Sequence, residues 1–251
     1  LSQKESVMGG NGKKTLVIRN GVLIDGTGSP PQENDALVIE GNHIRSVGPI
    51  QADLQLEDRD NVQVIDAAGQ WVMPGLIDSH VHLSFGRPDY SGVPVAKGTT
   101  SAEFSAIRAA MNAQNVLRAG VTSISVPGGA WFVDVAVRGA INAGLVEGPR
   151  IFCAGRILSV WGGGGDKEPS WTGTPDHATG ILCNGPEAMA LEVRRQCKHG
   201  VNLIKLIDSD WGIVQAISRE ELSAAVGEAH RRNARVAIHA RGSKSIRNAI
   251  D

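Results

Sequence analysis

The sequence predicts an α/β fold that follows a small all-β unit. Short β-type runs separated by turn residues fill the first part of the 251-residue chain. After Pro74, apolar strand-like runs alternate with amphipathic helical runs, and a glycine separates several of these helices from the next strand. Alternation of this kind is typical of parallel strands that helices cover on both faces. We therefore assign residues 1–72 to the all-β unit and residues 73–251 to the α/β unit.

The N-terminal unit contains short strands joined by turns. Asn20-Gly21 and Gly41-Asn42 are typical of tight turns, and Pro30-Pro31 marks a loop. The predicted strands are 16–19, 21–24, 36–40, 41–47 and 62–65. Their length and β-branched composition predict a small sheet structure.

The α/β unit is predicted to repeat one strand–helix element. The expected strands are 76–83, 121–126, 150–154, 201–207 and 235–240, and the expected helices include 102–118, 132–143 and 187–199. These three helices stop at Gly120, Gly144 and Gly200, because glycine accepts the left-handed geometry of a helix end. Ser218-Arg-Glu-Glu221 is a capping box that opens a further helix, and residues 243–250 form the last one.

Periodicity alone leaves two architectures open, a doubly wound sheet and a closed eight-stranded barrel. The residues that could carry chemistry lie on the first, fourth and fifth predicted strands or at their C-terminal ends. A barrel gathers such residues at one mouth, whereas an open sheet binds ligands between two neighbouring strands. Their distribution therefore favours the barrel.

His80 and His82 are the first candidate metal ligands. In a strand over 76–83, Asp78, His80 and His82 would share one face, so that two imidazoles could reach one metal ion. The alternative is a chance pair of polar residues at a strand end.

Lys205 is the only charged residue within the predicted apolar strand 201–207. A buried ammonium is costly, and three explanations remain open: a partner carboxylate, a neutral amine with a shifted pKa, or a carbamate formed with carbon dioxide. The carbamate would ligate metal ions as a carboxylate does.

His239 and Arg241 share one face at the end of the predicted fifth strand. His239 is either a metal ligand or a hydrogen-bonded structural histidine. Arg241 is either a contact for a substrate carboxylate or a solvated loop residue.

Composition excludes several classes of function. The 25 basic and 26 acidic residues leave a net charge of -1, which favours neither nucleic acid nor an anionic membrane as a partner. The 3 cysteines are too few and too scattered for a disulfide framework, and no apolar run reaches the length of a membrane span. A cytoplasmic protein that acts on a small molecule is expected.

Several motifs together resemble the amidohydrolase superfamily of metal-dependent hydrolases. They are Asn20-Gly21-x-x-Ile24-Asp25-Gly26, Val72-Met-Pro-Gly-Leu-Ile-Asp-Ser-His-Val-His82, Ala119-Gly-Val-Thr-Ser123, Leu203-Ile-Lys205 and Val236-Ala-Ile-His-Ala240. Within the superfamily, the chain is most similar to the branch of Xaa-Pro dipeptidases and imidazolonepropionase-like enzymes.

This resemblance implies a (β/α)8 TIM-type barrel flanked by a small β-sandwich, and two divalent metal ions with zinc as the first choice. His80 and His82 would bind one ion, carboxylated Lys205 would bridge both, and His239 would bind the second. A metal-bound hydroxide would then cleave an amide or peptide-like C–N bond of a dipeptide or an acylated amino acid. Asp78 would either orient a ligand ring or serve as a strand-end carboxylate.

The chain also departs from the family pattern. Complete members carry a further histidine on the sixth strand and an aspartate on the eighth, whereas this sequence stops at Asp251 after five predicted strands. The catalytic aspartate is therefore expected beyond residue 251. The alternative function is a non-catalytic fragment or subunit that a homo-oligomer or a missing C-terminal half completes. A Gly/Pro-rich loop over residues 159–180 follows the third predicted strand and is a candidate lid for the site.

Overall fold

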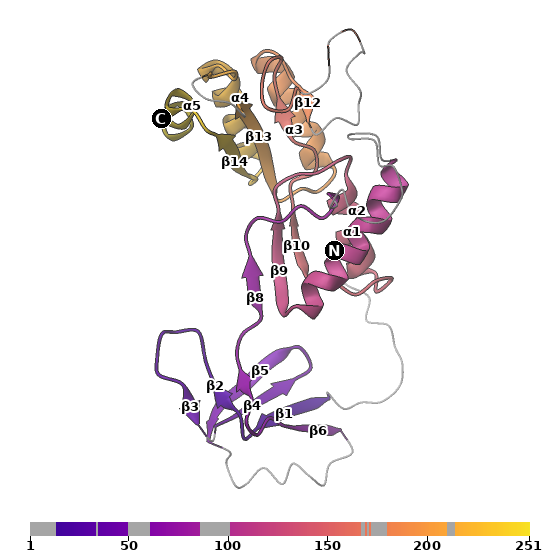
Figure 1. Cartoon of the computed structure of the whole chain (residues 1–251), viewed down its shortest axis with the longest axis vertical. Coiled ribbons are helices and arrows are strands. Elements are labelled where there is room, and N and C mark those ends of the chain that lie inside the picture. Colours follow the sequence, from indigo (N-terminus) through magenta and orange to yellow (C-terminus); the bar gives the residue numbers. More distant parts are fainter. Residues whose placement is uncertain are drawn as a thin grey trace. The chain divides into compact units, whose positions relative to one another are not determined.

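The computed structural model describes residues 14–33, 35–49, 61–85, 101–166, 169, 171, 180–209 and 214–251. The chain divides into two compact units, Leu1–Pro74 and Gly75–Asp251. The first unit is all-β and the second is α/β (Figure 1). The change from one to the other falls close to the boundary expected between residues 72 and 73.

The first unit contains two small sheets. One has the order β5-β4-β1-β6, with β1 at Thr15–Arg19, β4 at Asp35–Glu40, β5 at His43–Pro49 and β6 at Val62–Asp66. The other has the order β3-β2-β7, with β2 at Val22–Leu23, β3 at Gln32–Glu33 and β7 at Trp71–Val72. The predicted strands are confirmed, and β3 and β7 are additions too short to produce a sequence pattern.

The core of this unit lies on one face of the larger sheet. Val17, Ala36 and Val38 are buried there, because alternate residues of β1 and β4 point to the same side. The predicted turns are confirmed at Asn20 and Gly41, which both adopt a φ of 63°. Gly41 lies in the turn that reverses the chain between the antiparallel strands β4 and β5, and Asn20 lies in the turn that leads from β1 to β2.

The second unit is built from parallel strands. In one sheet β9, at Val121–Val126, lies between β8, at Leu76–Asp78, and β10, at Arg150–Cys153. The other sheet has the order β12-β11-β13-β14, with β11 at Leu158–Ser159, β12 at Ile181–Leu182, β13 at Leu203–Ser209 and β14 at Arg235–Ala240. Every pairing in both sheets is parallel.

Asn202 joins these two sheets. Its Oδ1 accepts a hydrogen bond of 2.9 Å from the backbone nitrogen of Cys153, and its own backbone nitrogen donates 2.8 Å to the Cys153 carbonyl. The strands β8, β9, β10, β13 and β14 thus follow one another in chain order, as successive strands of a barrel do. The described residues form two linked parallel sheets and not a closed ring.

The helices confirm the sequence prediction closely. They are α1 at Ala102–Arg118, α2 at Val133–Asn142, α3 at Pro186–Lys198, α4 at Arg219–Arg231 and α5 at Ser243–Ile250. The capping box at the start of α4 is present, with Ser218 Oγ accepting from Glu221 N and Glu221 accepting from Ser218 N. On α1, the fully buried Ala109 and Ala113 let the helix pack closely against the sheet residues Ile124 and Val126.

The prediction of a strand over 76–83 was wrong in its extent. β8 ends at Asp78, whose Oδ1 accepts a 3.0 Å hydrogen bond from the backbone nitrogen of His80. This contact bends the chain out of the strand, although Val81 still donates a backbone hydrogen bond to Ser125 on β9. His80 and His82 therefore lie in the segment after the strand.

Candidate metal centre

His80 and His82 lie together although they are not in a strand. Their ring centroids are 5.2 Å apart, and the rings meet edge to face. His80 is exposed and His82 is half-buried. The segment follows the carboxyl end of a parallel strand, where barrel enzymes place their active sites. Two imidazole rings therefore lie next to each other beyond the carboxyl end of β8.

The tautomer of His82 follows from its hydrogen bond. Nδ1 lies 2.7 Å from the carbonyl oxygen of Gly128, in the loop after β9. A carbonyl can only accept, so Nδ1 carries the hydrogen and Nε2 of the neutral ring keeps its lone pair. Burial lowers the pKa of His82, the hydrogen bond to Gly128 opposes this, and the charges of His80 and Lys205 lower it further. His82 is therefore held in the form that binds a metal ion.

Lys205 is buried in the middle of β13, with 5% of its surface exposed. Among the residues that the structure describes, no carboxylate forms an ion pair with it. Burial lowers the pKa of Lys205, which favours the neutral amine. Of the three explanations for this lysine, the ion pair thus has no support within the described part of the chain.

His239 lies on the same face of the second sheet as Lys205. In the register of β13 and β14, Lys205 pairs with Ala237 and Ile207 pairs with His239. Paired residues of neighbouring strands point to the same side, and alternate residues of one strand do so too. Ile204 and Leu206 point to the other side, into the core beneath the helices. Lys205 and the half-buried His239 therefore face away from the helices, His239 nearer the carboxyl ends.

The remaining candidates lie at strand ends. Asp78 binds the backbone of His80, which is the strand-end role and not contact with a histidine ring. Arg241 is exposed and follows the last residue of β14 directly. Arg241 lies two positions after His239, at the carboxyl end of β14. The histidine pair likewise follows the carboxyl end of its own strand, β8.

The residues present fit a metal site only when Lys205 is counted. Among the described residues, no group of three or more His, Cys, Asp and Glu side chains is arranged to hold a metal ion. His80 and His82 offer two nitrogen donors, and Lys205 would add oxygen donors once its amine is carboxylated. The neutral amine required for that reaction is the form that burial favours here.

The structure reveals contributors that the sequence did not indicate. The Gly128 carbonyl has no side chain to mark it, and Arg108 and Asn112 on α1 donate to the segment that follows His82. The sequence contained one weak sign of the role of Asn112. It is a polar residue beside the buried Ala113, on a helix face that packs against the sheet.

The predicted lid over 159–180 lies partly outside the described residues. Its beginning is a tight glycine turn in which Gly164 N donates 2.9 Å to the Asp208 carbonyl and Gly165 N donates 3.1 Å to Ser159 Oγ. A Cβ added to Gly163 would lie 2.6 Å from Ser159 Oγ. Gly163 and Gly165 are therefore required for close packing, because a Cβ at either position would meet Ser159 of β11.

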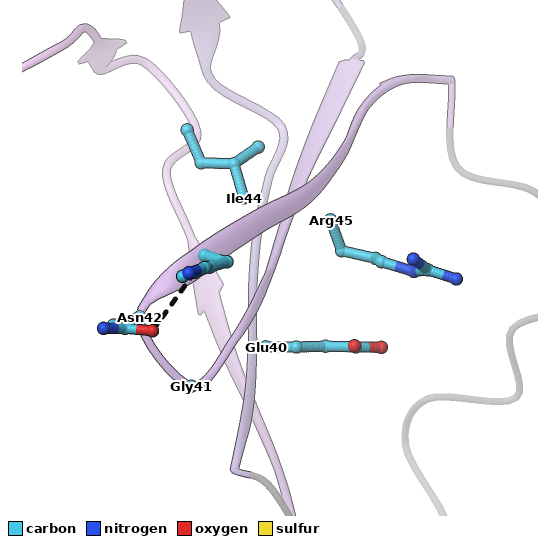
Figure 2. A pocket seen from close by; sticks show the side chains of 6 residues that line it. Glu40, Gly41, Asn42, Ile44 and Arg45 are labelled. Carbon is cyan, nitrogen blue, oxygen red and sulfur yellow. Dashed lines mark hydrogen bonds between the residues drawn. The ribbon is translucent and has the colours of Figure 1, made fainter. Parts of the chain in front are cut away.

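A groove on the first unit is unrelated to these candidates. It lies on the hairpin between β4 and β5, where Glu40–Arg45 line it and His43 contacts Asn42 (Figure 2). None of the predicted site residues belongs to it. In the described part of the chain, no helix combines the length and the apolar character that crossing a membrane requires.

Comparison with known proteins places this chain in a family. The amidohydrolase family matches residues 71–251. An ochratoxinase from Aspergillus niger is 31% identical over 264 aligned residues, which cover 94% of this chain and 52% of that protein. The chain thus spans about half the length of such curated relatives, although nearly all of the chain itself is aligned.

Solved structures agree. The crystal structure of a Xaa-Pro dipeptidase with bound methionine in the active site has a TM-score of 0.78 at 29% identity and covers 94% of this chain and 59% of that one. The crystal structure of the A. niger ochratoxinase has a TM-score of 0.76 at 29% identity, with 96% and 59% covered. The predicted resemblance to the dipeptidase branch is confirmed.

Proposed function

Because the chain belongs to the amidohydrolase family, we propose that it carries the metal-binding part of a hydrolase that cleaves an amide or peptide-like C–N bond. The single observation that carries the proposal is the His80–His82 pair after β8, with a buried Lys205 near enough for its ammonium form to lower the pKa of His82. Hydrolysis of an unactivated amide needs a strong nucleophile and stabilisation of the oxyanion. Residues arranged to hold divalent ions meet both needs.

The proposed roles follow the chemistry of each side chain. His80 and His82 would bind a metal ion through ring nitrogen, carboxylated Lys205 would add oxygen donors, and His239 would contribute from β14. Two divalent ions, zinc in the first place, would acidify a water molecule and polarise the substrate carbonyl. The Gly128 carbonyl keeps the donor nitrogen of His82 available. The proton-transferring aspartate is expected from the part of the family fold that follows residue 251.

The proposed fold is a (β/α)8 barrel with a flanking β-sandwich, to which this chain contributes the first five parallel barrel strands and the two small sheets. In such a barrel the strands β8, β13 and β14, with which His80, Lys205 and His239 are associated, converge on one mouth. The order of the strands along the chain and their parallel pairing support this arrangement.

The proposed substrate is a dipeptide or an acylated amino acid. Among the relatives are an ochratoxinase and a Xaa-Pro dipeptidase whose structure holds methionine in the active site. A free carboxylate is common to such substrates, and the exposed Arg241 would bind it through paired hydrogen bonds. A small molecule, and neither nucleic acid nor a membrane, is the proposed partner.

A second candidate function is a non-catalytic subunit. One observation favours it: within the described residues the site has two adjacent histidines and no complete cluster of conventional ligands. In this case a second copy or a separate polypeptide would complete the site.

Metal analysis of the purified protein distinguishes these functions. The hydrolase predicts about two ions per chain and hydrolysis of dipeptides or N-acyl amino acids that a chelator abolishes and zinc restores. Protein that binds no metal after zinc loading, and hydrolyses no member of such a panel, would support the non-catalytic subunit instead. A His80→Ala variant should lose both metal and activity, whereas His230→Ala, an exposed histidine on α4, should lose neither.

A further inference from the structure

The backbone segment that follows His82 is held by one face of helix α1. Asn112 Nδ2 donates 2.8 Å to the Leu83 carbonyl and 3.3 Å to the Phe85 carbonyl. Arg108 Nη2 donates to the carbonyl of Ser84, which lies between them. Three consecutive carbonyls are thus bound by two side chains of one helix.

Arg108 and Asn112 can act together because they are four residues apart on α1. Residues at this spacing lie above one another on a helix surface. The face is turned toward the protein, since Ser105, Ala109 and Ala113 on the same side are buried. Carbonyls beyond a strand end have lost their sheet partners and need other donors. The two side chains supply these donors at Leu83, Ser84 and Phe85.

The loop after β9 holds the same segment from a second element. The Gly128 carbonyl accepts from His82 Nδ1 at 2.7 Å, and Ser84 Oγ accepts from the backbone nitrogen of Ala130 at 3.3 Å. The approach is close enough to require glycine. Gly128 has a φ of 95°, and a Cβ at Gly129 would lie 2.6 Å from Ser84 Oγ.

We propose that Arg108 and Asn112 are positioning residues for His82. By fixing the carbonyls of Leu83–Phe85 from α1, they hold the ring where Nδ1 donates to Gly128 and Nε2 remains available to a metal ion. His82 directly precedes Leu83, whose carbonyl is the first of the three that are bound, so a displaced segment moves the ring with it. The metal-binding part of this inference rests on the proposed function, whereas the tautomer of His82 can be tested without metal.

Asn112→Asp is the sharpest variant, because it keeps the size of the side chain and replaces both amide donors with acceptors that repel the carbonyls. The matched control is Asn115→Asp, the same change at an exposed position on the same helix. Arg108→Met removes the donor to the Ser84 carbonyl, and Arg108→Lys restores a donor at this position. Two readouts are measured: side-chain NMR of 15N-histidine in metal-free protein, with the His82 signals assigned by His82→Gln, and zinc affinity by competition with a chromophoric chelator.

The wild-type protein and Asn115→Asp should show His82 protonated at Nδ1. Asn112→Asp should show a mixture of tautomers and a zinc affinity about 10- to 100-fold weaker, the usual cost of losing a group that orients a ligand. Arg108→Met should change in the same direction, and Arg108→Lys should recover part of the loss.

An unchanged His82 tautomer in Asn112→Asp, with zinc affinity within about twofold of wild type, would overturn the inference even if the melting temperature fell. If Asn112→Asp does not fold, the same two readouts on Arg108→Met decide. Failure of the wild-type protein to bind zinc would reject the proposed function alone, because the tautomer comparison would still test the positioning role.

Discussion

Lys205 has an environment in which an ordinary charged lysine would be unstable. It is 5% exposed, and no described carboxylate pairs with it. A buried ammonium without a counter-charge is destabilised, and loss of its proton relieves the cost of burying the charge. Accordingly, burial lowers the pKa of Lys205 and favours the neutral amine. The neutral amine is a nucleophile toward carbon dioxide, which makes the proposed carbamate chemically reasonable.

Lys205→Ala tests this role. We expect the variant to lose bridged metal and hydrolytic activity, and we expect short carboxylic acids such as formate or acetate to restore part of both, because they replace the missing oxygens. Bound zinc per chain and hydrolysis of the substrate panel are the measurements. Lys244→Ala, an exposed lysine on α5, is the control. Full metal content and activity in Lys205→Ala would remove the bridging role.

The cysteines give a second prediction at the residue scale. Burial raises the pKa of Cys153 to about 12 and that of Cys183 to about 12, so neither forms the reactive thiolate near neutral pH. Both should therefore resist a thiol reagent in the native protein and react after unfolding. Mass spectrometry of the labelled peptides checks this. Rapid labelling of either cysteine in native protein would contradict the burial on which the pKa rests.

At the scale of elements, helix α4 is joined to α3 by one buried carboxylate. Glu228 Oε1 accepts hydrogen bonds of 3.0 Å from Arg194 on α3 and 2.7 Å from Arg232. Arg231 forms a further ion pair of 2.9 Å with it. The hydrogen bonds from Arg194 and Arg232 lower the pKa of Glu228 to about 2. A carboxylate with a lowered pKa stabilises the folded state only while it is ionised.

Glu228→Gln should therefore flatten the acid limb of the stability curve. The contribution of Glu228 is complete above its ordinary pKa of 4.5 and is lost as the pH falls toward about 2. Between about pH 6 and about pH 3, the melting temperature of the wild-type protein should thus fall more than that of Glu228→Gln. Glu220→Gln, an exposed carboxylate on the same helix, should follow the wild-type curve. Parallel curves for wild type and Glu228→Gln would refute the assignment.

At the scale of the whole molecule, the candidate ligands belong to different sheets of the second unit. His80 and His82 follow β8, whereas Lys205 and His239 lie on β13 and β14. A ligand that binds residues from several elements stabilises the folded chain, because the unfolded chain does not hold them together. Metal binding should consequently be visible in the thermal unfolding of the protein.

Zinc should raise the melting temperature of the wild-type protein. At a free zinc concentration about 100 times the dissociation constant, the expected stabilisation is about 2.7 kcal/mol, which corresponds to a rise of several degrees. The double variant His80→Ala/His82→Ala should show no such rise, and His230→Ala should behave as wild type. Differential scanning calorimetry with and without chelator makes the comparison. An equal rise in the double variant would show that zinc binds elsewhere.

The elements were predictable because they depend on neighbours in the sequence. Helix α1 was predicted at its observed bounds, and the capping box of α4 was read directly from Ser218 and Glu221. The extent of β8 was not predictable in this way. Apolar and polar residues alternate over 76–83 as in a strand, yet the Asp78 carboxylate binds the backbone of His80 and ends the strand early. A hydrogen bond from the backbone to a nearby side chain competes with the backbone hydrogen bonds of the sheet.

The sequence by itself determined the succession of helices and strands, the amidohydrolase resemblance and the candidate ligands His80, His82, Lys205 and His239, because periodicity, capping and motif spacing are local properties of the chain. Only the tertiary structure decided that the histidine pair lies beyond its strand, that Lys205 is buried without a described counter-ion, and that Gly128 fixes the tautomer of His82. It also brought Arg108 and Asn112 to the segment after His82. Apart from the contact between Asp78 and His80 that ends β8, these features depend on residues far apart in the chain. Several involve backbone carbonyls, which every residue possesses and no sequence pattern can distinguish.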